Sequence, residues 1–133
     1  MNLELFCTLF ILQFVGHKVA DYLFQGEKDA IYKSKVFKHL FRHCLIYSSI
    51  VTLFVSFLYP HAALLVFSVT MLEHLIIDSR TPVVGWKYFF EKKIMRNKDF
   101  DINKSPFFVI IETDQTFHLL RILLLSLFIA HYS

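Results

Sequence analysis

The chain has 133 residues, of which 56% are hydrophobic; its mean hydropathy is +0.51 and its formal net charge is +3. This apolar fraction exceeds that of ordinary soluble domains, and the length leaves room for one domain only, over residues 1–133. Sixteen Phe and only three Gly fit long buried helices better than a turn-rich β fold, and two cysteines make no disulfide framework.

Four apolar segments follow one another along the chain, and each predicts a membrane-spanning helix. They cover residues 3–24, 44–58, 62–77 and 107–130. A helix needs about 20 residues to cross the hydrocarbon core, so the middle two segments are slightly short. Pro60 lies between those two and cannot continue a helix interior, which predicts a tight helical hairpin. The predicted fold is therefore an all-α, integral-membrane four-helix bundle.

The basic residues predict how these helices are oriented. Twelve of the fourteen Lys and Arg residues lie in residues 26–42 and 80–104. By the positive-inside rule these two segments are cytoplasmic loops, and both chain termini face outward. We therefore expect a multi-pass protein of the cytoplasmic (inner) membrane, in contact with the lipid bilayer and without a nucleic-acid partner. A homodimer stays open, since four short helices make a small bundle, but no stripe of small residues marks a dimer face.

Ionisable residues lie in or directly beside every apolar segment. Seven of them share this pattern: His17, Asp21, His43, His74, Asp78, Asp114 and His118. All except His43 form His/Asp pairs spaced four residues apart, which places both side chains of a pair on one helix face. Ionisable groups inside a membrane are costly and mark functional sites. Given the predicted topology, all seven fall in the cytoplasmic half of the bundle, and we expect them to line one cavity open to the cytoplasm.

Imidazole and carboxylate groups are the ligand set of Zn, Mn and Fe sites, and helical bundles build dinuclear sites from such residues on facing helices. We therefore predict that the seven residues bind divalent metal, Zn or Mn, as one or two ions. His43, Asp78 and Asp114 are the predicted catalytic residues, with His43 either a ligand or a general acid/base. Each residue taken alone could instead form a hydrogen bond between helices, but seven in one layer would need many mutual partners.

Polar residues beside these seven are predicted to orient them. The candidates are Gln25, Glu73, Glu112 and Gln115. Tyr47 lies one turn beyond His43 and is predicted to hydrogen-bond into the site. Lys18 and Arg121 are predicted to point away from the cluster, where they either snorkel to the membrane surface or bind an anionic substrate, and snorkelling is favoured. Residues 86–90 predict either an amphipathic interfacial segment or an ordinary cytoplasmic loop.

The segments that carry these residues resemble the bacterial membrane family DUF3307. They are residues 17–25 (HKVADYLFQ), 43–47 (HCLIY), 73–78 (EHLIID) and 114–118 (DQTFH). They occur in the family's order and cover nearly the whole chain outside residues 81–105. The resemblance implies a bacterial membrane protein but no activity, because the function of the family is unknown. The pattern is also similar to that of the YdjM-like membrane-bound metal-dependent hydrolases, which implies metal-dependent hydrolysis.

These observations predict a metal-dependent hydrolase of phosphoesters or phosphoanhydrides that acts on a small phosphorylated or lipid-linked substrate. The alternative is a metal or proton transport or binding module. Transport would need a polar track to the outer face, and the outer parts of the first and fourth segments offer only Thr8, Gln13 and Ser126 as polar residues. A third alternative is a structural membrane partner of another protein, in which the polar layer holds the helices together.

Overall fold

The computed structural model describes residues 1–132, and helices account for most of them. Four are long: α1 (Leu3–Leu23), α3 (Phe37–Ser56), α4 (Ala63–Asp78) and α6 (Phe107–Tyr132). The short connecting elements are α2 (Glu27–Tyr32), η1 (Pro60–Ala62), α5 (Thr81–Phe89), the π-helical turn η2 (Phe90–Ile94) and η3 (Ile102–Lys104). No strand occurs within residues 1–132, in agreement with the predicted all-α class.

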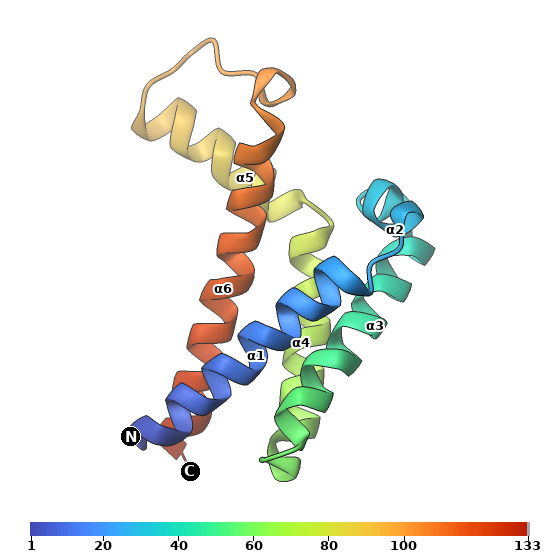
Figure 1. Cartoon of the computed structure of the whole chain (residues 1–133). Coiled ribbons are helices and arrows are strands. Elements are labelled where there is room, and N and C mark those ends of the chain that lie inside the picture. Colours follow the sequence, from blue (N-terminus) through green and yellow to red (C-terminus); the bar gives the residue numbers. More distant parts are fainter. Residues whose placement is uncertain (133) are drawn as a thin grey trace.

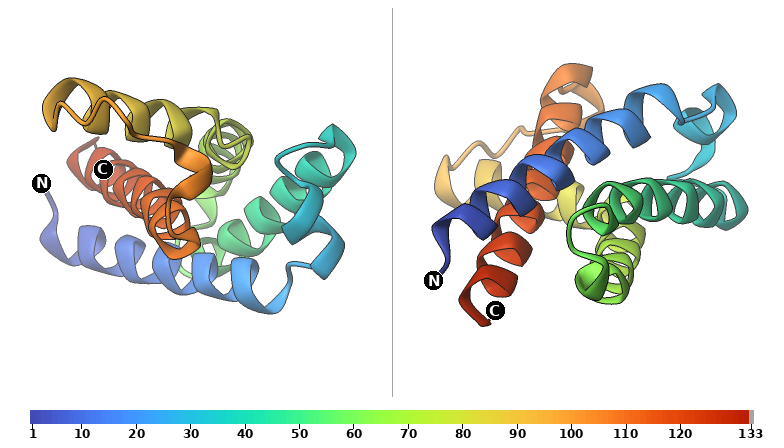
Figure 2. Two further views of the ribbon diagram at one scale, coloured as in Figure 1. Left: turned by 90° about the horizontal axis from the view of Figure 1, so that it is seen from above. Right: turned by 60° about the horizontal axis from the view of Figure 1, so that its bottom comes forward.

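The long helices contact one another in a ring, in which α1 and α4 each pack against both α3 and α6. Both termini and the turn between α3 and α4 lie at one end of the molecule, which we call the terminal end (Figure 1). The elements α2 and α5 lie at the opposite end, the loop end. Figure 2 shows α1 running alongside α6 and on toward α3. A hydrogen bond of 3.0 Å from Asn2 N to Ala130 O joins the two ends of the chain.

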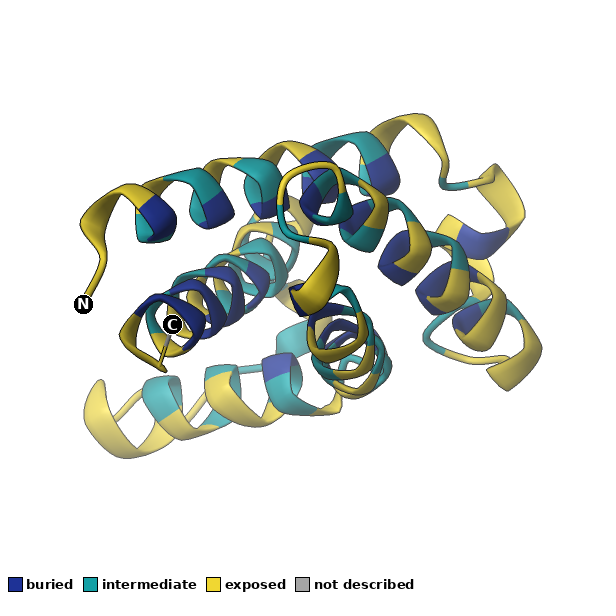
Figure 3. Cartoon of the chain, turned by 90° about the horizontal axis from the view of Figure 1, so that it is seen from below, coloured by how far each residue is buried: buried dark blue, intermediate teal, exposed yellow. Residues whose placement is uncertain are grey.

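Each long helix buries the face that it turns toward the others, and its outward face is exposed (Figure 3). Along α1 the buried residues recur at helical spacing, from Leu5 and Leu9 to His17 and Ala20. Toward the terminal end the buried side chains are mainly apolar and form one cluster. Toward the loop end they are mainly polar. The fold therefore packs an apolar layer below a polar layer.

Three helical segments are long and apolar enough to cross a membrane: Leu3–Leu23, Phe37–Ser56 and Pro60–Asp78. They expose large apolar side chains, such as Leu64 and Leu72, that a soluble protein would cover. These features indicate a membrane protein. The 26-residue α6 is not among the three candidates; Glu112, Asp114 and Arg121 lie along it. Three of the four predicted membrane spans thus correspond to candidate segments in the structure. The fourth span, α6, stays a prediction.

Two predicted boundaries were wrong. The second long helix begins at Phe37 rather than at residue 44, so His43 lies in its second turn and not at its start. Residues 27–32 form α2, where the sequence pattern predicts a loop. The two elements contact each other, because Asp29 of α2 binds two residues of the first turns of α3. Its Oδ1 atom lies 2.7 Å from His39 Nδ1, and its Oδ2 atom accepts a hydrogen bond of 3.0 Å from Arg42 Nε. We call these contacts the Asp29 latch.

Candidate metal centre

The four long helices bring six of the seven predicted ligands into one cluster near the loop end. They are Asp21 from α1, His43 from α3, His74 and Asp78 from α4, and Asp114 and His118 from α6. Helical spacing aligns the pairs within one helix: His74 Nε2 lies 3.2 Å from Asp78 Oδ2, and His118 Nε2 lies 3.8 Å from Asp114 Oδ2. The three imidazoles and Asp78 are buried, whereas Asp21 and Asp114 are partly exposed.

The first donor group consists of Asp21, His43 and His74, with Asp78 beside them. The two imidazole Nε2 atoms of His43 and His74 are 3.0 Å apart. Asp78 Oδ2 lies 3.2 Å from each of these nitrogens. Asp21 Oδ1 lies 3.3 Å from His43 Nε2 and 3.7 Å from His74 Nε2. Ligands at about 2.0–2.1 Å from a tetrahedral ion are themselves about 3.3 Å apart. The spacing of these donor atoms therefore fits a single ion among them.

The second donor group consists of Asp78, Asp114 and His118. His118 Nε2 lies 3.2 Å from Asp78 Oδ1, so the two oxygens of Asp78 face different groups. One carboxylate oxygen points to the imidazoles of His43 and His74, and the other points to His118. A carboxylate in this position can bridge two ions. Glu73, His74 and His118 form a third set whose donor atoms lie close enough to share an ion.

Several buried polar atoms in the cluster lack a hydrogen-bond partner among the described residues. They include Asp21 Oδ1, Asp78 Oδ2 and His74 Nδ1. Buried polar groups without partners are rare in folded proteins, and buried carboxylates need a compensating positive charge. Asp21 Oδ1 belongs to the first donor group and Asp78 Oδ2 lies beside it, so one cation between them would contact both oxygens. The donor set and its unpaired oxygens therefore fit a divalent ion.

His118 has an outer partner at one ring nitrogen, while its other nitrogen, Nε2, faces Asp78 Oδ1 at 3.2 Å. Its Nδ1 lies 2.9 Å from Glu73 Oε1, and this bond assigns the proton to Nδ1. The second oxygen of Glu73 accepts a hydrogen bond of 3.1 Å from Arg121 Nε. A carboxylate behind a ligand histidine is the usual way to fix its ring and tautomer. Of the predicted orienting residues, Gln25, Glu73 and Gln115 thus contact the cluster, while Glu112 is exposed.

The expected snorkelling of Arg121 was wrong. Its side chain is buried and donates to Tyr47 Oη at 3.1 Å and to Gln13 Oε1 at 2.9 Å, besides its bond to Glu73. A signal for this was present in the sequence, since a spacing of three residues from His118 turns Arg121 by only about 60° on the helix. Tyr47 reaches the cluster as predicted, and its ring stacks on that of His74 with 3.6 Å between centroids.

His17 lies beside the cluster but in none of the donor groups. Its Nδ1 is 2.7 Å from Tyr47 Oη, and its Nε2 is 3.0 Å from Gln115 Oε1. Gln115 in turn donates a hydrogen bond of 3.2 Å to Asp21 Oδ2. Both ring nitrogens of His17 therefore have protein partners, and the residue supports Asp21 through Gln115. Its predicted role as a ligand stays a prediction.

Lys33 is a member of the site that sequence reasoning missed. Its Nζ lies 2.7 Å from Asp78 Oδ2 without hydrogen-bond geometry, and 3.3 Å from His43 Nε2. Burial lowers the pKa of Lys33, but the negative charges of Asp78 and Asp21 outweigh burial and raise it above its usual value. Nothing in the sequence signals this contact, because Lys33 is one of several basic residues between two apolar segments. The Asp29 latch docks α2 on α3 and so positions it.

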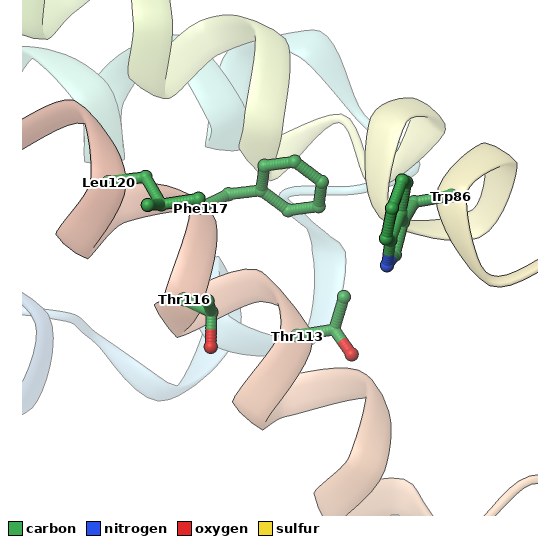
Figure 4. A pocket seen from close by; sticks show the side chains of 5 residues that line it. All are labelled: Trp86, Thr113, Thr116, Phe117 and Leu120. Atoms are coloured by element: carbon green, nitrogen blue, oxygen red, sulfur yellow. The ribbon is translucent and has the colours of Figure 1, made fainter. Parts of the chain in front are cut away.

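Two cavities border the polar layer at the loop end. The larger has a volume of about 310 Å³ and is lined by Asp21, Asp114, Lys33 and Arg80, among others. The smaller, of about 20 Å³, shares Lys33, Arg80 and Asp114 with it and reaches Asp78. Solvent thus approaches the candidate ligands from the loop end. A separate apolar cavity of about 420 Å³ lies between α5 and α6 (Figure 4). No acidic, basic or histidine side chain lines this one.

Comparisons with known proteins show which family the chain resembles. The model of a protein family described as a protein of unknown function (DUF3307) matches residues 9–133. No curated protein and no solved structure matches the chain.

Proposed function

The chain belongs to the DUF3307 family, whose function is unknown, and we propose that it is a membrane-embedded, divalent-metal-dependent hydrolase of phosphoesters or phosphoanhydrides. The observation that carries this proposal is the position of Asp78. Its two oxygens face two donor groups that hold imidazoles and carboxylates from all four long helices. Two ions held by one bridging carboxylate can clamp a phosphate between them.

We propose that all four long helices span the inner membrane, with both termini outside. The distribution of charge supports this orientation, since twelve of the fourteen Lys and Arg residues fall in the segments around α2 and α5. Both of those elements lie at the loop end, and the termini lie at the other (Figure 1). The site would then be reached from the cytoplasm or from the inner leaflet.

The donor set favours zinc or manganese over calcium or magnesium, because imidazoles contribute as many ligands as carboxylates. Cysteine takes no part, since Cys7 is exposed far from the cluster and Cys44 is buried outside the donor groups. When bound, divalent ions lower the pKa of a water and polarise a phosphoryl oxygen.

The protein's own groups would handle the proton and the substrate. In the hydrolysis a water oxygen bonds to phosphorus, the bond from phosphorus to the leaving oxygen breaks, and the water gives up a proton. Asp114 is the proposed acceptor of this proton, because it lines the open cavity and its side chain is the most exposed of the three carboxylates, at 18%. His43, at the inner side of the cavity, is the alternative acceptor. On the side of the polar layer away from the cavity, Arg121 donates a hydrogen bond to Tyr47.

One observation bears on the transport alternative. Gln13 and Ser126, both buried, hydrogen-bond to each other at 2.8 Å, and Gln13 accepts a hydrogen bond from Arg121. These hydrogen bonds extend the polar layer toward the terminal end as far as Gln13 and Ser126. Beyond them lies the apolar cluster around Leu9 and Val66. We therefore favour hydrolysis, and metal flux into proteoliposomes would support transport instead.

The test is a turnover screen of the protein in lipid nanodiscs. Phosphoesters, nucleotides and lipid pyrophosphates would be offered with Mn and with Zn. Asp78→Asn and Asp114→Asn keep the shape of the carboxylates but remove their charge, so they should abolish turnover while the protein stays folded. His131→Ala, at the terminal end, should retain full turnover. The proposal fails if no substrate is hydrolysed and both Asp→Asn variants merely unfold at lower temperature.

A further inference from the structure

The loop-end cavity of about 310 Å³ combines basic and acidic side chains. Asp21 and Asp114 line it from α1 and α6, and they belong to the two donor groups. Lys33 and Arg80 line it from outside the long helices, one at the end of α2 and the other just before α5. Its volume is sufficient for a phosphate group with several further atoms. A group entering the cavity thus meets two basic side chains next to the candidate ligands.

Arg80 adopts a backbone conformation that costs free energy. Its φ is 62°, in the left-handed region that residues other than glycine rarely occupy. Its backbone N–H donates a hydrogen bond of 2.8 Å to Ile77 O at the end of α4, and its guanidinium has no ion-pair partner within residues 1–132. A left-handed residue commonly ends a helix in this position, where it turns the chain from α4 into α5. The conformation leaves an unpaired guanidinium on the wall of the cavity, two residues after Asp78.

The charges around the cavity change sign when metal binds. Three carboxylates, Asp21, Asp78 and Asp114, face two basic groups, so the protein alone leaves one negative charge. One divalent ion makes this balance positive by one charge, and two ions make it positive by three. Lys33 Nζ contacts Asp78 Oδ2, the oxygen that faces the first donor group. An ion bound to this oxygen would displace the Lys33 ammonium and leave it available to an anion. Metal and an anion should therefore bind cooperatively.

We propose that Arg80 and Lys33 form an anion subsite that holds the phosphate group of the substrate beside the metal centre. This inference rests on the proposed function, which it extends by naming the residues that bind the substrate. A guanidinium presents two parallel N–H groups to two phosphate oxygens, and an ammonium adds a compact charge. Both side chains come from the short elements at the loop end, whereas the ligands come from the long helices.

The test measures binding of inorganic phosphate to the protein in phosphatidylcholine nanodiscs, with and without Mn. Arg80→Gly removes the guanidinium and at the same time relieves the left-handed strain, so the variant should fold at least as well as the natural protein. We expect its phosphate affinity to fall by about tenfold or more, since a charge-assisted contact is lost, with metal content unchanged. The matched control is Arg96→Gly: Arg96 is also left-handed, with φ 57°, but it is exposed and outside the cavity. It should bind phosphate normally.

Lys33→Gln supplies a second variant and should weaken phosphate binding more with Mn present than without it. Equal phosphate affinity in Arg80→Gly, Arg96→Gly and the natural protein would overturn the subsite, even if metal binds as proposed. Absence of metal would overturn the proposed function alone, and the metal-free comparison of the two arginine variants would still decide the subsite.

Competition then identifies the source of the phosphate group. Displacement of phosphate by phosphatidic acid in the nanodisc, but not by soluble glycerol phosphate, would support a lipid headgroup. The reverse pattern would support a soluble phosphoester. If neither compound competes, the phosphate measured does not occupy the proposed subsite, and the inference fails.

Discussion

Arg121 is a buried basic residue whose guanidinium is fully engaged inside the protein. It donates to Glu73, Gln13 and Tyr47, and these bonds join α6 to α4, α1 and α3 respectively. Each partner would lose a donor if the guanidinium were removed, and Glu73 would become an uncompensated carboxylate. A single side chain thus links the candidate metal centre to the apolar layer beneath it.

Arg121→Ala should therefore lower the free energy of unfolding by about 3–5 kcal/mol, the usual cost of breaking a buried ion pair. Lys18→Ala is the control, because Lys18 is only partly buried and its nearest polar contact, Gln115 Oε1, is 3.4 Å away. We expect a change of about 0–1 kcal/mol there. Unfolding in mixed micelles would measure both. Equal effects of the two variants would show that Arg121 is not engaged as described.

At the scale of elements, the approach of α1 to α3 depends on one glycine. A Cβ atom at Gly16 would lie 3.1 Å from the Cα of Val51, which is tighter than ordinary contact and involves backbone that cannot move alone. Gly16 directly precedes His17, so the close approach also sets the position of the polar layer. Gly85 of α5 has nothing within 4 Å of the same position.

Gly16→Ala should be less stable than Gly85→Ala by roughly 1–3 kcal/mol, the typical cost of overpacking. Both changes raise helix propensity, so this gain cancels in the comparison. Thermal unfolding of the two variants in one detergent is the measurement. If Gly16→Ala is as stable as Gly85→Ala, α1 and α3 are not in close contact.

The Asp29 latch makes docking of α2 dependent on pH. Arg42, and then His39, stabilise the ionised carboxylate and hold the pKa of Asp29 below its usual value. A lowered pKa in the folded state stabilises docking above the ordinary carboxyl range near 4, and this stabilisation is lost as the pH falls through the lowered value. Protection of α2 amides from exchange, corrected for intrinsic rates, should therefore fall between about pH 5 and about pH 2.

Asp29→Asn is the control for this titration, since it keeps the side chain but has no charge to lose. Its α2 amides should be less protected at neutral pH, and any pH dependence that remains belongs to other carboxylates. A variant with the same protection and the same pH profile as the natural protein would contradict the latch.

The sequence predicts what depends on local spacing and misses what depends on contacts between elements. The pair His74/Asp78 follows from helical periodicity, and the structure places its donor atoms 3.2 Å apart. The contact of Asp78 with His118 depends on the order and rotation of helices, which periodicity does not contain. A search for apolar segments misses the start of α3, because the first turns of this helix contain polar residues. Lys33 lies at the end of a separate short helix, so the periodicity of the long helices does not place it near the ligands.

At the scale of the whole molecule, the proposed orientation predicts which surfaces meet the cytoplasm. Lys98 lies in the connection before α6, at the loop end, and His61 lies in the turn at the terminal end (Figure 1). A cysteine at Lys98 should react with an impermeant thiol reagent only after the cells are opened. A cysteine at His61 should react in intact cells. Labelling of Lys98→Cys from outside would reverse the orientation.

The central claim is that the donor groups joined by Asp78 bind divalent metal, and metal content tests it most directly. Protein purified without chelator and reconstituted with Zn or Mn should carry one to two ions per chain by elemental analysis. Asp78→Asn should lose nearly all of this metal, whereas Asp21→Asn and Asp114→Asn should each lose only the ion of their own group. A natural protein without metal, or an Asp78→Asn variant with the full amount, would contradict the account.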